Sequence, residues 1–519
     1  MSTNKFGILT LGVIFMTVGA LLTLTNIEVT SLPSFFQLIL QKELALSPWS
    51  RSFKIWRSNP VPIYLDFYFF NWTNPEDIRN NETKPNFVEM GPYRFHENKE
   101  VVQVKFHDNG TVSYKQERRW YFDSEYSAGS LKDNVTTLNA VVVSAAATVK
   151  NWAWFQQAGL SAVLGTFGQK LHETKTVGEF LFDGYENKLL NMAKKMPMLK
   201  IPYDKFGWFY TRNGSDQFDG HFNIDTGQNG IHNIGKVYQW QYTNTTSFYE
   251  GTCAMVNGTS GTLFPPVRSK QDRVTMYSPD LCRSISFDYS RVESVEGVPG
   301  YRFVGSEYIV DNGTLDPSNE CFCNGECVPS GVINVTSCRF GAPAFVSYPH
   351  FYKADPYFAS LVTGMKPERD KHEFYLTLEP STGIPLDVGA RFQINLLLQP
   401  IESIMMFRKV PRIFFPMIWF SNRATMPASM SGELQLLLWV PCVSLVFCAV
   451  VFLLGVGLII YSMLYQRELH QYAESTCDRF VSDIIRDPNK YNSSPLRQLL
   501  PKDSSTEQSY DCPYLTTET

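Results

Sequence analysis

The chain has 519 residues, and its 46 lysines and arginines nearly balance 50 aspartates and glutamates, for a formal net charge of −4. This balance argues against a nucleic-acid partner, because proteins that bind nucleic acids usually have a strongly basic surface. Two long apolar segments, one near each end of the chain, instead predict a membrane protein.

The first predicted element is a transmembrane helix over residues 6–25, a stretch without a charged side chain. Twenty helical residues cover about 30 Å, which is about one hydrocarbon thickness. A cleaved signal peptide is the alternative. The apolar region of a signal peptide is roughly 7–15 residues long and ends at a cleavage site with two small residues. This segment is longer, and Ala20 has no second small residue at the required spacing. Lys5 precedes the segment, so residues 1–5 are predicted to be a short cytosolic N-terminus.

The second predicted transmembrane helix covers residues 434–465, between Glu433 and Arg467. This segment is longer than a bilayer needs. A proline is tolerated at the start of a helix but not inside it, so the span is predicted to begin near Pro441, with Trp439 as an interfacial anchor.

With these two spans, residues 26–433 form an ectodomain and residues 466–519 form a cytosolic tail, so both termini are cytosolic. The tail is rich in proline, serine and threonine, which predicts little ordered structure. Cys477, and less so Cys512, is a candidate for S-acylation, and an unmodified thiol is the alternative.

Nine N-glycosylation sequons lie in the ectodomain and support its outward orientation. The predicted glycosylation sites are Asn71, Asn81, Asn109, Asn134, Asn213, Asn244, Asn257, Asn312 and Asn334.

Six of the ten cysteines fall in the second half of the ectodomain, namely Cys253, Cys282, Cys321, Cys323, Cys327 and Cys338. The closely spaced cysteines from Cys321 to Cys327 resemble half of a zinc site, but zinc ribbons need two paired clusters of cysteine or histidine ligands. An oxidising compartment favours disulfides instead. Six cysteines allow fifteen pairings, and their spacing does not choose among them.

The ectodomain is predicted to begin with a helix over residues 32–46, followed by strands. Alternating apolar residues flank Asn109-Gly110, which is a strong hairpin signal. The alanine-rich run within residues 131–157 fits a buried helix.

A second helix is predicted from the capping box of Thr176 and Glu179 to Pro197, with apolar residues at helical spacing. Beyond residue 201 the pattern returns to strands and turns, including alternation on both sides of a turn at residues 380–383. The body is therefore predicted to be mainly antiparallel β, with a helical insertion near residues 131–197. No linker or repeat divides it.

The sequence contains no recognisable catalytic or cofactor-binding motif, so we predict that the protein is not an enzyme and needs no metal or cofactor. His172-Glu173 lacks the second histidine of a zinc protease motif, and there is no G-x-S-x-G sequence. Residues 230–236 resemble a phosphate loop, but Val237 stands where the magnesium-binding Ser or Thr should be.

A family resemblance extends over nearly the whole chain, including both apolar ends. The chain resembles the class B scavenger receptors, the group of fatty-acid translocase, lysosomal integral membrane protein and sensory neuron membrane protein. The matching stretches are GPYRF from Gly91, DNVTTLN from Asp133, DGY from Asp183, CAMVNGTSGTLFPP from Cys253, DLCRSI from Asp280, YRFV from Tyr301, CFC from Cys321, YPHF from Tyr348, LEPSTG from Leu378 and RFQINLLLQP from Arg391.

This resemblance implies an α+β membrane protein with two transmembrane helices, an antiparallel β-barrel body and a helical bundle at its apex. It implies an apolar tunnel through the body and disulfides that join Cys253 to Cys321, Cys282 to Cys338 and Cys323 to Cys327. The basic residues at the family's apex do not map one-to-one onto this chain. Lys170 is the nearest candidate, with Lys150, Lys175 and Lys188 as its neighbours. A solvated helix face is the alternative explanation for these lysines.

The predicted function is that of a plasma-membrane scavenger or lipid receptor. Its expected partners are lipids, fatty acids and lipoprotein-like or apoptotic particles, and it could form a homo-oligomer. The alternative is a sorting receptor for a lumenal protein in the endosomal or lysosomal membrane. Leu499-Leu500 resembles a dileucine signal, but Pro495 replaces the usual acidic residue, which favours the cell surface.

Overall fold

The computed structural model describes residues 2–26, 35–80, 82–195, 204–267 and 269–487. It divides the chain into two compact units, residues 1–38 with 437–519, and residues 39–436. The helix predicted over residues 32–46 falls partly outside the described residues. Within them, α2 (Phe35–Leu44) is helical as predicted.

The first unit contains α1 (Ser2–Asn26) and most of α9 (Ala428–Arg486), and both helices are long and apolar enough to cross a bilayer. Glycines let the two helices approach closely. A Cβ added to Gly12 would lie 2.9 Å from Ile459, and one added to Gly455 would lie 2.4 Å from the Met16 nitrogen. Small residues at such contacts are typical of helix pairs in membranes.

The prediction of little order after residue 465 was wrong for its first part. α9 continues to Arg486 and includes Cys477. No proline lies between Tyr465 and Pro488, so every residue of this stretch keeps its backbone donor, and the helix propagates out of the apolar span. The helix also begins before Pro441, which lies inside it.

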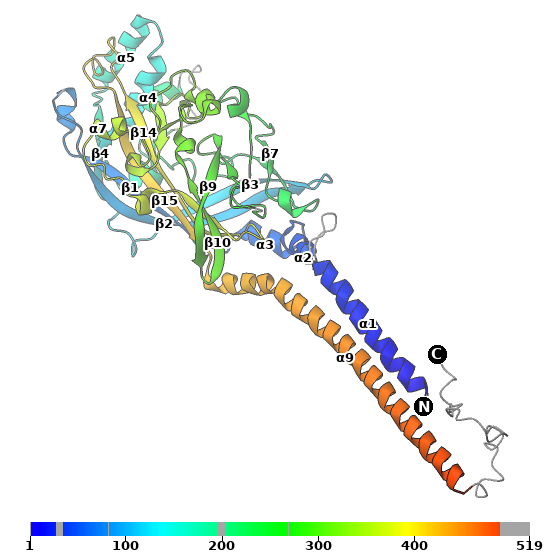
Figure 1. The fold of residues 1–519 in the computed structure, drawn as a ribbon. Helices are drawn as coiled ribbons and strands as arrows, with labels where there is room; N and C mark the ends of the chain where they lie inside the picture. Colours follow the sequence, from blue (N-terminus) through cyan, green and yellow to red (C-terminus); the bar gives the residue numbers. More distant parts are fainter. Residues whose placement is uncertain (1, 27–34, 81, 196–203, 268, 488–519) are drawn as a thin grey trace. The chain divides into compact units, whose positions relative to one another are not determined.

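The second unit is a large antiparallel sheet with helices at its ends (Figure 1). Its strands are β1 (Ile63–Trp72), β2 (Phe87–Phe106), β3 (Thr111–Phe122), β4 (Asn134–Leu138), β5 (His172–Thr176), β6 (Phe222–Asp225), β7 (Val237–Trp240), β8 (Val274–Ser278), β9 (Arg283–Val295), β10 (Val298–Gly305), β11 (Ile333–Asn334), β12 (Ala344–Ser347), β13 (Tyr375–Leu378), β14 (Pro385–Leu398) and β15 (Ile413–Thr425). Its helices, besides α2, are α3 (Arg51–Ser58), α4 (Ala140–Val149), α5 (Trp154–Thr166), α6 (Lys188–Lys194), α7 (Pro356–Ser360) and α8 (Arg369–His372).

Thirteen of the described strands form one sheet in the order β7-β6-β3-β2-β1-β15-β14-β13-β10-β9-β8, with β11 and β12 attached beside β14. A short segment joins the two outer strands. The Val237 nitrogen of β7 donates to the Gly258 carbonyl at 2.8 Å, and the Tyr277 nitrogen of β8 donates to the Thr259 carbonyl at 2.8 Å. The sheet therefore forms a nearly closed barrel, which leaves few unpaired edge groups.

Aromatic and β-branched side chains form the main core inside this sheet. Phe67 and Phe69 on β1 and Phe415 on β15 are at most 1% exposed, and Phe67 packs edge-on against Phe95 of β2. A smaller cluster around Trp56, Tyr114 and Tyr277 packs beside it. Both cores bury large rings, which contribute most to hydrophobic stabilisation.

The predicted hairpin at Asn109-Gly110 is confirmed by the pairing of β2 with β3. Gly110 has φ +78°, a value that favours glycine, and the His107 nitrogen donates to the Thr111 carbonyl at 2.9 Å. The alternation around residues 380–383 is likewise confirmed as the β13–β14 hairpin.

The two helices predicted within residues 131–197 are shorter than expected. The alanine-rich run, predicted as one helix, contains the end of β4 and then α4. The chain leaves the helical conformation at residues 150–153 before α5 begins. The second prediction is wrong beyond its first turn. The capping contacts of Thr176 and Glu179 exist, with the Glu179 nitrogen donating to Thr176 Oγ1 at 3.2 Å, but only one π-helical turn follows. Gly184, at φ +65°, ends that turn, and helix resumes at α6.

Three disulfides stabilise the part of the second unit around β8 and β9. They join Cys253 to Cys321, Cys282 to Cys338 and Cys323 to Cys327. These are the pairs implied by the family resemblance.

Candidate functional site

The helical region lies at the end of the barrel where β4 and β5 form a separate two-stranded sheet (Figure 1). α4 is buried along most of its length, and the side chain of Asn139 caps it by accepting from the Val142 nitrogen at 3.1 Å. α5 packs against α4 and is held to the loop after β14, where the Met405 nitrogen donates to Ser161 Oγ at 3.0 Å. We call α4, α5, α6, β4 and β5 the apex.

Three of the four predicted lysines are exposed at the apex, and the structure brings two of them near each other. The Asn187 side chain donates to Gln169 Oε1 at 3.3 Å, so the adjacent residues Lys170 and Lys188 lie on neighbouring segments. Lys150 follows α4, and its ammonium group donates to Gln399 Oε1 at 3.3 Å.

Lys175 differs from the other three because its charge is already engaged. Its ammonium group lies 3.8 Å from Glu179 and 4.9 Å from the centre of the Tyr185 ring. An ion pair and a cation–π contact both hold this side chain on the surface of β5. Lys175 is therefore a poor candidate for contact with an external anion.

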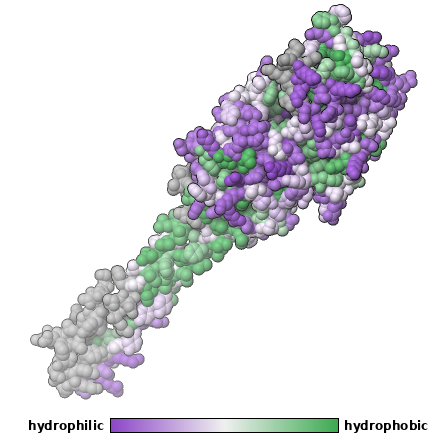
Figure 2. Space-filling model, turned by 180° about the vertical axis from the view of Figure 1, so that it is seen from behind, coloured by the Kyte–Doolittle hydropathy of each residue, from purple (hydrophilic) through white to green (hydrophobic). Residues whose placement is uncertain are grey.

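Exposed aromatic side chains at the start of α5 were missed from the sequence. Trp154 is 74% exposed and Phe155 is 61% exposed, and Met405 in the adjoining loop is 78% exposed. Figure 2 shows apolar surface at the end of the unit where α5 lies. The helical spacing of Leu160, Leu164 and Phe167 would have excluded Trp154 and Phe155 from the buried face of α5.

A half-buried carboxylate, Glu173, lies on β5. The hydroxyl of Tyr185 donates to Glu173, and burial raises the pKa of Glu173 to about 7. Lys175 opposes this rise but does not cancel it. Glu173 thus changes charge within the pH range between the cell surface and acidic compartments.

We expect the β4–β5 sheet to be more stable at pH 5 than at pH 7.5. In the unfolded chain Glu173 has its ordinary pKa of 4.5. Between pH 4.5 and about pH 7 the folded state therefore binds more protons than the unfolded chain. The resulting stabilisation is full below pH 4.5 and is lost as the pH rises through about 7. Hydrogen exchange of residues 134–138 and 172–176 measures this. Glu173→Gln should flatten the pH dependence, and an unchanged slope in that variant would assign the effect to another group.

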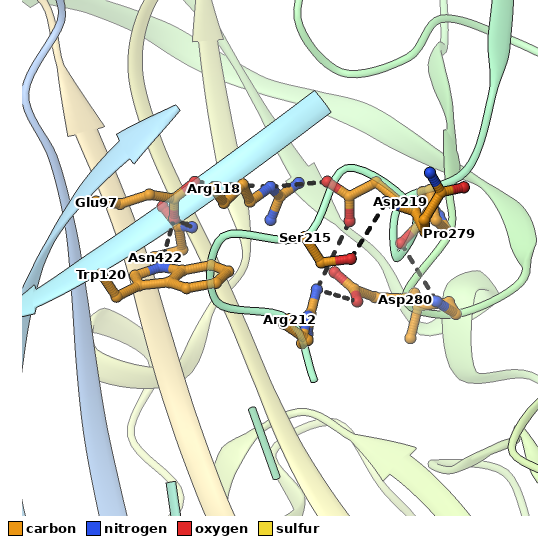
Figure 3. Close-up of polar contacts among 12 residues, drawn as sticks. Glu97, Arg118, Trp120, Arg212, Ser215, Asp219, Pro279, Asp280 and Asn422 are labelled. Atoms are coloured by element: carbon orange, nitrogen blue, oxygen red, sulfur yellow. Dashed lines mark hydrogen bonds and ion pairs between the residues drawn. The ribbon is translucent and has the colours of Figure 1, made fainter. Parts of the chain in front are cut away.

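A cluster of charged and polar side chains lies in the barrel outside the apex (Figure 3). Arg118 of β3 lies 2.9 Å from Asp219 and 3.7 Å from Glu97 of β2. Glu97 also accepts from the Trp120 indole at 3.1 Å and from the Asn422 side chain of β15 at 3.2 Å. One carboxylate therefore joins three strands.

The same cluster holds two loops to the barrel. Arg212 donates to Asp280 Oδ1 at 2.6 Å, and Arg339 donates to the Asp280 carbonyl at 2.6 Å. Burial alone would raise the pKa of Asp280, but the charges of Arg212, Arg118 and Arg339 outweigh it and lower the pKa. The cluster fixes loops, and its position indicates a structural function.

The sequon asparagines differ in exposure. Asn109, Asn134, Asn213, Asn244 and Asn257 are exposed, Asn71, Asn312 and Asn334 are half-buried, and Asn81 lies outside the described residues. The half-buried side chains already make polar contacts, as when the Asn312 amide donates to the Val328 carbonyl at 2.8 Å.

Comparisons with known proteins identify the family. The CD36 family model matches residues 10–466. Protein peste of Drosophila melanogaster is 40% identical over 437 residues, which cover 83% of this chain and 77% of that protein. Scavenger receptor class B member 1 of Cricetulus griseus is 35% identical over 76% of this chain and 77% of its own length. Lysosome membrane protein 2 of Homo sapiens is 34% identical over 76% and 82%.

The family match over residues 10–466 includes the barrel, the apex and most of the two apolar helices. These comparisons confirm the resemblance seen in the sequence motifs, and they confirm that the chain is related to receptors and not to enzymes. The chain belongs to the CD36 family.

Proposed function

We propose that the protein is a cell-surface receptor that binds amphipathic or anionic lipid particles at its apex and passes lipid through the barrel toward the membrane. The observation that carries the proposal is the exposed pair Trp154 and Phe155, which follows the exposed Lys150 closely in the sequence. Lipid ligands present apolar chains together with negatively charged head groups. Exposed aromatic rings and exposed ammonium groups at the apex complement both parts.

Candidate ligands are fatty acids, lipids, and lipoprotein-like or apoptotic particles. The tunnel would run through the aromatic core of the barrel, and tethers at both ends would keep its exit near the bilayer. We propose the plasma membrane as the location, with both termini cytosolic and the ectodomain glycosylated. The similarity to lysosome membrane protein 2 supports the endosomal or lysosomal membrane as the second location, and there a lumenal protein would be the ligand.

Reversing the charge of Lys150, Lys170 and Lys188 to glutamate is expected to reduce binding of anionic lipid vesicles about tenfold or more, because the field that attracts them is inverted. Lys175 is left unchanged, since a glutamate there would lie against Glu179. Binding to cells that display the protein measures the effect. Wild-type binding should weaken as salt rises.

The matched control reverses three exposed lysines outside the apex, Lys42, Lys54 and Lys366, and so changes the net charge equally. This control should retain wild-type binding. If both triple variants reach the surface and bind anionic vesicles equally, the apex lysines are a solvated face and the basic part of the proposal is wrong.

A further inference from the structure

A polar groove lies on the barrel, separate from the apex. It has a volume of about 1150 Å³, and its walls come from the ends of β2 and β3, from β6 and β7, and from the loop after β7. Side chains alternate along β3. Val112 and Tyr114 point into the smaller core, whereas Thr111 and Ser113 line the groove.

The walls of the groove contain almost only neutral polar groups. Except for Lys105 and Asp225, the lining side chains are amides, hydroxyls, imidazoles and tyrosines. Asp225 already accepts from the Tyr238 hydroxyl at 2.9 Å. None of the lining residues has an aliphatic or phenylalanine side chain, so the groove does not resemble an acyl-chain site. A molecule rich in hydroxyl groups would find donors and acceptors on every side.

An aromatic ring stands exposed in this groove. Tyr242 is 67% exposed, and its ring stacks on His221 with centroids 4.2 Å apart and planes 18° apart. Two consecutive residues with positive φ, Gln241 at +51° and Tyr242 at +66°, form the turn that presents this ring. Nδ1 of His221 is buried and has no hydrogen-bond partner among the described residues. The faces of sugar rings carry C–H groups that pack on such an aromatic platform.

Two sequon asparagines, Asn109 and Asn244, line the same groove. At Asn109 the side-chain oxygen accepts from the Thr111 hydroxyl at 2.8 Å and from the Thr111 nitrogen at 3.2 Å. This contact fixes the amide plane and leaves the nitrogen, to which a glycan is attached, without a protein partner in the described part of the chain. The turn itself is held by Thr226, whose hydroxyl donates to the Gly110 carbonyl at 2.7 Å.

We propose that this groove is the binding site of the chain's own N-linked glycan at Asn109, and that its proximal sugars pack on Tyr242. An external oligosaccharide would have to displace a glycan rooted in the same wall. The proposal rests on use of the Asn109 sequon and is independent of lipid binding at the apex. The glycan would complete the wall of the barrel with covalently tethered sugar.

The test compares trimming rates of individual glycans on the folded, full-length protein. The protein is made in cells that produce only oligomannose glycans, treated with an endoglycosidase without denaturation, and analysed by glycopeptide mass spectrometry. We expect trimming at Asn109 to be about tenfold slower than at the exposed Asn213, which corresponds to about 1.4 kcal/mol of packing. Denatured protein should show no difference.

Two variants of Tyr242 assign the protection to the ring. Tyr242→Asn removes it and tolerates positive φ, so trimming at Asn109 should rise to the rate at Asn213. Tyr242→Phe keeps the ring and should keep the protection. The proposal is overturned if Asn109 carries no glycan, if Asn109 and Asn213 are trimmed equally fast in the wild type, if Asn244 is the protected site instead, or if Tyr242→Asn leaves the rate unchanged.

Discussion

Arg118→Ala is expected to destabilise the barrel by about 3–5 kcal/mol, the usual effect of removing one partner from a buried ion pair. The side chains of Glu97 and Asp219 are only 1% and 6% exposed, so neither carboxylate can recover its hydration when the guanidinium is removed. The lost ion pairs lie where β2, β3 and β15 meet. Thermal unfolding of the full-length protein and its delivery to the cell surface both measure the effect.

The neighbouring residue provides a matched control. Arg119 pairs with Glu117 at 2.5 Å on the opposite face of β3, and its side chain is 57% exposed. Arg119→Ala should cost about 0–1 kcal/mol, as is typical of surface pairs. Equal effects of the two substitutions would show that Arg118 does not stabilise the barrel through its buried carboxylates.

Replacing both Cys282 and Cys338 with serine is expected to cost about 4 kcal/mol, because a cross-link over 56 residues removes much entropy from the unfolded chain. The same double replacement at Cys323 and Cys327, whose separation is 4, should cost only about 2 kcal/mol. Non-reducing peptide mapping first verifies the pairs, and thermal unfolding then ranks them. A larger loss for the short loop would contradict the chain-entropy account.

Local signals in the sequence predicted much of this fold. The apolar segments, the Asn-Gly turn and the alternation around residues 380–383 each depend on neighbours in the chain, and each was found. The capping box at Thr176 was also found, but the helix that it begins ends at Gly184. Gly184 has a positive φ, and a Cβ at this position would lie 3.0 Å from the Tyr210 ring. The helix therefore ends where the chain packs against Tyr210, and the local sequence signal does not contain this tertiary contact.

Contacts between distant segments were not predictable in this way. Glu97, Arg118 and Asp280 are ordinary charged residues in the sequence, and only the barrel brings them together. The pairs of cysteines were open among fifteen arrangements until the family resemblance supplied one. At the apex, the sequence predicted the basic residues. It did not predict the ion pair between Lys175 and Glu179 or the exposure of Trp154, because both depend on the tertiary structure.

The position of β1 has a consequence for biosynthesis. β1 lies between β2, which follows it directly, and β15, which begins about 340 residues later. At about 5–20 residues per second, one edge of β1 waits roughly 20–70 s for its partner. β15 ends at Thr425, just before α9 begins at Ala428. On the proposed topology, the strand that completes the sheet therefore arrives together with the second anchor, and until then lumenal chaperones must protect the open edge.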